Sequence, residues 1–232
     1  MIHQISFPNA QRESGNVLVV ILLAIVLIGA LSVAIQGSSQ RNATIDQEKI
    51  ILSITEVQRY MAELERAVNY IMQNGHSESD IRFAHPDAHT DYGDLSSDTD
   101  KSDQVFDRDG GAALYRGAPE DVNDGSSWEF YGNTALPLVG SDRPELIAVL
   151  PNISETFCRN INNAIGYDAS GIPEDTGTCL SGVAGERFDN GTQFSSSPNT
   201  VNTVTFTIQP SVQGCAICDD KNMHFFYVLM AR

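Results

Sequence analysis

Hydrophobic residues run from Val17 to Ile35 without a charge, and Ser32 is the only polar side chain among these 19 residues. At ~1.5 Å per residue, a helix of this length comes close to the ~30 Å hydrocarbon thickness of a bilayer. It is also longer than the ~7–15 apolar residues of a cleaved secretion signal. We therefore expect a transmembrane segment over residues 17–36, which would hold the chain in the inner membrane in a single pass, with the leader in the cytoplasm and the larger part outside.

A second hydrophobic pattern follows, in which apolar residues recur at alternating spacings of four and three. Such spacing is typical of one face of an amphipathic helix. The positions are Ile50, Ile54, Val57, Met61, Leu64, Val68 and Ile71. No proline or glycine interrupts residues 38–74, and Gly75 is placed to end the helix. The pattern predicts one long helix over residues 16–75, or, if residues 37–44 are not helical, an anchor followed by a separate amphipathic helix.

The rest of the chain mixes short strand patterns with one helix. Residues 76–103 are polar and predict an exposed loop. Strands are expected at "QVFD", "AALYRG", "SWEFYG", "NTVTFTIQP" and "MHFFYVLMAR", and a helix at "PNISETFCRNINNAIG". We expect an α+β fold in which the long N-terminal helix packs on a β-rich globular head. The expected divisions are a leader over 1–15, the helix over 16–75 and the head over 76–232.

The net charge and the absence of known catalytic motifs limit the classes of function that the sequence favours. Thirty acidic residues against 14 basic ones give a net charge of -16, which disfavours nucleic acid as a partner because its phosphates would be repelled. The sequence contains no P-loop, GxGxxG, GxSxG or HExxH motif. We therefore expect that the protein is not an enzyme.

Four cysteines lie in the last third of the chain, at Cys158, Cys179, Cys215 and Cys218. An even number in an oxidising compartment favours two disulfides, and three pairings are open. We favour a bond from Cys158 to the segment that holds Cys215 and Cys218. The "CAIC" spacing is also that of a redox dithiol, although the aspartates that follow it would raise a thiol pKa.

Two acidic turns resemble fragments of calcium-binding loops. They are "DRDGG", with Asp107 and Asp109, and "DVNDG", with Asp121 and Asp124. Neither continues to the glutamate that completes an EF-hand loop. We expect no cofactor, with calcium at these four aspartates as the alternative.

The combination of an apolar helix, an amphipathic continuation and a β-rich head with late cysteines resembles type IV pilins and the pseudopilins of type II secretion. Prepilins of these families carry a short leader that ends in glycine before an apolar stretch. Here Gly15 stands at the end of the leader, Asn16 would be the first mature residue, and "LLAIVLIGALSVAI" is similar to the family's apolar run. The resemblance implies cleavage after Gly15 by a prepilin peptidase and methylation of Asn16.

The chain departs from the family at the fifth mature position, where it has Val20 instead of the usual glutamate. The departure favours a minor or divergent subunit. The head, with "VFDRDGGAALYRG", "SWEFYGN" and "FFYVLMAR", is also similar to pilin-like proteins of alphaproteobacteria. The resemblance implies a structural subunit of a type IV pilus or type II secretion-like filament. Its partners would be other pilin-like subunits, contacted through the N-terminal helix, and an assembly platform. The alternative functions are a membrane-anchored periplasmic binding protein and an anchored thiol oxidoreductase.

Overall fold

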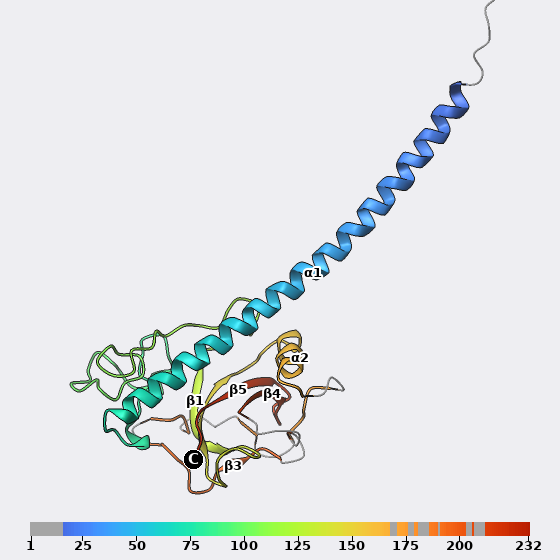
Figure 1. Cartoon of the computed structure of the whole chain (residues 1–232). Helices are drawn as coiled ribbons and strands as arrows, with labels where there is room; N and C mark the ends of the chain where they lie inside the picture. The colour runs from blue at the N-terminus through green and yellow to red at the C-terminus, as the bar shows by residue number, and fades with distance from the viewer. Residues whose placement is uncertain are drawn as a thin grey trace, which may run out of the picture. The chain divides into compact units, whose positions relative to one another are not determined.

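The computed structural model describes residues 16–167, 171–175, 179–180, 186–189, 191–202, 206 and 212–232 (Figure 1). Within helix α1 (Asn16–Gln73) the described side chains are those of residues 19–28 and 47–73. The chain divides into two compact units, Met1–Glu48 and Lys49–Arg232, and α1 contributes to both.

In the first unit, the described side chains from Val19 to Ile28 are apolar and exposed. Over the described residues, no helix is both long and apolar enough to cross a membrane. The expected fold class with a membrane-spanning half, and the expected location in the inner membrane, are therefore wrong. The described side chains of α1 give an apolar run of ten residues, Val19–Ile28, whereas a helix needs about 20 to cross a ~30 Å bilayer core. The rest of the expected span lies outside the described side chains.

In the second unit, the C-terminal part of α1 buries one face, as its spacing predicts. Of the seven apolar positions from Ile50 to Ile71 that form the predicted face, which we call the stripe, six are buried, and Ile50 packs against them. They share a core with strand residues such as Phe130 and Phe225. Each large side chain that is fully buried in this way contributes about 1.5–3 kcal/mol. The helix ends at Gln73, and Gly75 follows with a φ of 99°, the left-handed conformation that glycine adopts at helix ends.

A five-stranded sheet forms the centre of this unit. Its strands are β1 (Glu129–Ala135), β2 (Glu145–Leu150), β3 (Asn199–Thr200), β4 (Gln213–Ile217) and β5 (Met223–Met230). The order is β3-β1-β2-β5-β4, antiparallel except for the β1–β3 pair. Helix α2 (Glu155–Ala164) lies beside β4 and β5 (Figure 1).

Hydrophobic clusters cover both faces of the sheet. In β2, Leu146 and Ala148 belong to the cluster that contains α1, whereas Ile147 and Val149 belong to the second cluster. Successive side chains of a strand point to opposite faces, so a strand buried on both sides reads as a continuous apolar run. That is why "ELIAVL" shows no alternation.

Two predictions for the segments after α1 are wrong. The 76–103 segment is not simply an exposed loop, because Ile81, Phe83 and Tyr92 are buried, and the Phe83 ring stacks on Phe130 with centroids 4.0 Å apart. The segments "QVFD" and "AALYRG" form turns and irregular backbone in place of strands. The Ala113 N–H donates to the Val105 carbonyl at 3.0 Å, which folds the two segments back on each other.

Candidate functional site

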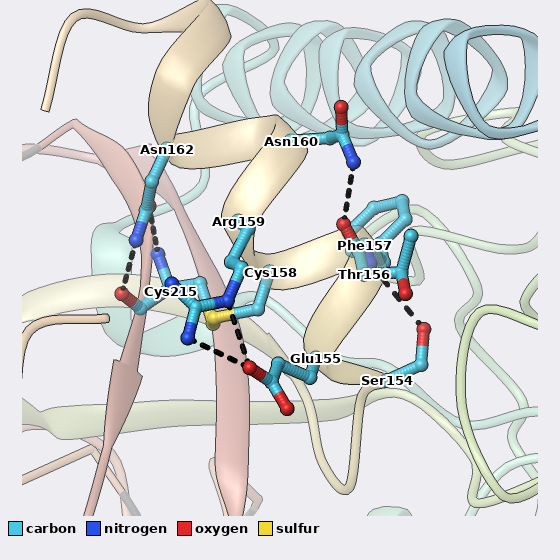
Figure 2. Close-up of a disulfide and its surroundings, with 9 residues drawn as sticks. All are labelled: Ser154, Glu155, Thr156, Phe157, Cys158, Arg159, Asn160, Asn162 and Cys215. Atoms are coloured by element: carbon cyan, nitrogen blue, oxygen red, sulfur yellow. Dashed lines mark hydrogen bonds and ion pairs between the residues drawn. A yellow bond between two sulfur atoms is a disulfide. The ribbon is translucent and has the colours of Figure 1, made fainter. Parts of the chain in front are cut away.

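The cysteine region joins α2 to the edge of the sheet. Cys158 on α2 and Cys215 on β4 form a disulfide with a Cα–Cα distance of 5.5 Å, and both residues are fully buried (Figure 2). Ser154 caps the start of α2 by accepting a hydrogen bond from the Phe157 N–H. The helix is thus fixed at its first turn and attached covalently to β4.

One turn further along, Asn162 binds the backbone of the same strand. Its Nδ2 donates to the Cys215 carbonyl and its Oδ1 accepts from the Cys215 N–H, both at 2.9 Å (Figure 2). The Asn162 amide therefore takes the place of a neighbouring strand. Ile217 makes a similar pair of backbone bonds, donating to the Pro173 carbonyl at 2.8 Å and accepting from the Asp175 N–H at 2.9 Å. Together these contacts cover the open edge of β4, which would otherwise pair with another chain.

The two cysteines of "CAIC" have different partners. Cys215 bonds to Cys158, and Cys218 bonds to Cys179 with a Cα–Cα distance of 5.6 Å. The expectation of two disulfides is confirmed. A redox dithiol of the thioredoxin type bonds its own two cysteines to each other, and here all four residues are buried in long-range bonds. This arrangement disfavours the thiol oxidoreductase.

The first pair of calcium candidates lies in a tight turn. The Asp107 carboxylate accepts a hydrogen bond from the Asp109 N–H at 2.9 Å and lies 3.8 Å from the Lys101 ammonium. Asp109 lies 3.9 Å from the Arg108 guanidinium. Both carboxylates therefore face basic side chains.

The second pair is also engaged by neighbouring side chains. Asp121 forms an ion pair with Lys49 at 2.7 Å. Asp124 accepts from Ser126 and from the Asn152 amide, and the Ser126 hydroxyl and N–H hold the pKa of its carboxyl below the ordinary value. In the part of the chain that the structure describes, no three His, Cys, Asp or Glu residues are grouped so that they could hold a metal ion.

The structure does not describe the expected cleavage site between Gly15 and Asn16. Gly15 lies outside the described residues, and so does the side chain of Asn16. The apolar segment that follows is described from Val19 to Ile28, where nine large hydrophobic side chains are 54–65% exposed. We call these ten residues the exposed apolar segment.

Sequence reasoning missed two charged residues, the partly buried Arg187 and the fully buried Glu145. The Arg187 guanidinium is 13% exposed and bridges Asp91 at 2.8 Å and Glu129 at 2.9 Å. No local pattern could reveal partners 96 and 58 residues away. Glu145 is fully buried at the start of β2, where desolvation raises the pKa of its carboxyl to about 7 and its Oε2 accepts from the Leu136 N–H at 3.0 Å. A signal for this residue exists in the sequence, because it is the one acidic residue that opens the apolar run "ELIAVL".

No protein-family model, curated protein or solved structure matches this chain.

Proposed function

We propose that this protein is a structural subunit that assembles with other subunits into a filament of the type IV pilus or type II secretion-like kind, as a minor or divergent member. The observation that supports it is the exposed apolar segment. Ten successive residues, Val19–Ile28, carry no charged or polar side chain, and each large side chain among them is more than half exposed.

The distribution of this apolar surface around the helix argues for several neighbours. Ten residues make nearly three turns of helix, so consecutive apolar positions cover its whole circumference. A helix that is apolar on one side can be covered by a single partner, whereas one that is apolar all round must be surrounded. Each fully buried aliphatic side chain contributes about 1.5–3 kcal/mol. A bundle of like helices at the centre of a filament would bury these residues on every side.

Two features of the head favour assembly through the N-terminal helix and disfavour assembly by pairing of sheet edges. The outer edge of β4 is already occupied by Asn162 and by residues 173–175. The net charge of -16 also opposes close packing of heads through unspecific contacts. Processing after Gly15, which the resemblance implies, would place the exposed apolar segment close to the mature N-terminus.

Crosslinking of the full chain tests the proposal. A Val20→Cys/Ile28→Cys variant, treated with a bismaleimide reagent, should give a ladder of multimers, because each subunit would contact more than one neighbour. Leu52→Cys/Tyr70→Cys is the matched control, since both side chains are more than half exposed on the part of α1 that belongs to the second unit. Only monomers and dimers from the double variant would refute the filament.

A charge placed in the segment gives a second test. Leu23→Glu should abolish the large species seen by sedimentation, whereas Leu52→Glu should leave them unchanged. Mass spectrometry of the mature protein separately tests processing. An N-methylated Asn16 would support it, and an intact Met1 would exclude it.

A further inference from the structure

A polar hollow of about 400 Å³ lies beside β1 and β3. Its lining comes from Asn133 on β1, Glu186, the turn at 191–195, Ser197 and Asn199. Its volume falls in the range of sites that take small molecules, roughly 300–1,000 Å³. None of these residues belongs to the exposed apolar segment, so the hollow is independent of the proposed assembly.

The hollow is built by a turn held against β1. The Phe188 N–H donates to the Phe130 carbonyl at 2.9 Å, and the Ser195 N–H donates to the Gly132 carbonyl at 3.0 Å. A Cβ at Gly132 would lie only 2.4 Å from the Gln193 carbonyl oxygen, so a glycine is required for this close approach. Backbone contacts on both sides of the turn therefore form the hollow before any ligand arrives, which lowers the entropic cost of binding.

The lining presents oriented amides and hydroxyls. Asn133 is 5% exposed, and its Nδ2 donates to Glu186 Oε2 at 3.0 Å while its Oδ1 accepts from the Thr134 hydroxyl at 3.2 Å. These bonds fix the plane of the amide. An amide group carries two donor hydrogens and two acceptor lone pairs, so a fixed amide can serve a ligand in both roles. Gln193, Ser195 and Asn199 add further groups that donate and accept.

The charge of the lining excludes most other ligand classes. Among the described residues that line the hollow, Glu186 is the only ionisable one, so this lining offers no cation to an anionic ligand such as a phosphate. A single carboxylate is also too little for a metal ion, and the described residues hold no grouped set of metal ligands. An apolar ligand would remove water from the amides and hydroxyls without replacing their hydrogen bonds.

After anions, metal ions and apolar molecules are excluded, the lining fits a neutral ligand whose groups both donate and accept hydrogen bonds. Hydroxyl groups do both, and Phe194 supplies one aromatic ring in the lining. The Arg232 guanidinium lies 3.8 Å from the centroid of that ring and holds it in place. We propose that this hollow binds a neutral saccharide, at the scale of one or two sugar units.

The test uses the full chain with both disulfides intact. Glucose, galactose, mannose, N-acetylglucosamine and maltose are each added and followed by saturation-transfer NMR and calorimetry. We expect saturable binding of at least one of them. Gly191→Leu should weaken that binding by roughly tenfold or more, because Gly191 lines the hollow and a Cβ there meets only the Asp189 carboxylate at 3.4 Å.

Gly117→Leu is the matched control, since Gly117 is exposed, lies outside the lining and would have no atom within 4 Å of an added Cβ. Asn199→Ala, which removes one amide from the lining, should weaken binding several-fold and serves if Gly191→Leu does not fold. Glu186→Gln should keep most of the affinity, because the ligand needs a hydrogen-bonding group there and not a charge. Three results would each overturn the proposal. They are no binding of any of the five sugars, equal sugar affinity of Gly191→Leu and Gly117→Leu, and saturable binding of calcium ions in the hollow.

Discussion

Replacing Asn162 by alanine should destabilise the protein strongly, because one side chain holds both backbone groups of Cys215. Asn162 is 2% exposed and makes two hydrogen bonds of 2.9 Å to Cys215. Its removal strands a buried N–H and a buried C=O, each of which costs about 1–3 kcal/mol. We expect the free energy of unfolding to fall by about 2–6 kcal/mol, with the lower end reached if water enters the gap.

The control is Asn160→Ala on the same helix. The Asn160 amide donates only to the Thr156 carbonyl within α2, in an exposed position (Figure 2). Its loss should cost less than about 0.5 kcal/mol. Urea unfolding of both variants measures the difference, and hydrogen exchange should show faster exchange of the Cys215 amide in Asn162→Ala alone. Equal stability of the two variants, with the Cys215 amide still protected, would refute the role assigned to Asn162.

Three further predictions concern stability. Replacing Cys158 and Cys215 together by alanine should cost about 4 kcal/mol in chemical unfolding, from the chain entropy of a loop with a separation of 57 residues, and a loss below about 1 kcal/mol would contradict it. Leu64→Ala should lower the free energy of unfolding by about 2–5 kcal/mol because Leu64 is fully buried, whereas Leu52→Ala should be nearly neutral in the same assay. Burial raises the pKa of Glu145 to about 7 from 4.5, so the folded protein holds this proton more tightly than the unfolded chain. Stability should therefore fall as pH rises from about 4.5 to about 7, by at most ~1.4 kcal/mol per pH unit, and Glu145→Gln should remove that slope in urea unfolding at several pH values.

Elements whose pattern is local could be predicted from the sequence. The stripe from Ile50 to Ile71 packs in the core because its spacing matches the helical period, and α2 begins after Ser154 and ends before Gly166, as its capping residues indicate. Strand β2 escapes prediction because burial on both faces removes the alternation that marks a half-buried strand. The transmembrane prediction rests on length and hydropathy over residues 17–36, and the described helices do not meet that requirement.

The disulfide pairing and the polar hollow could not be predicted fully from the sequence, because they depend on contacts between residues that are far apart in the chain. The count of four cysteines predicts two disulfides, but the choice of partners requires the position of α2 against β4. The polar hollow depends on Gly132, whose missing Cβ admits the turn at 191–195. Nothing in the neighbouring sequence distinguishes this glycine from one in an ordinary turn.

The order of the disulfides along the chain has a consequence for proteolysis. The two covalent loops interleave, since Cys179 lies inside the Cys158–Cys215 loop and Cys218 lies outside it. A single cut of the backbone at any point between Cys158 and Cys218 is therefore spanned by at least one bridge. A protease that nicks the surface of this region would leave the subunit in one covalent piece, and only a reductant would release the fragments.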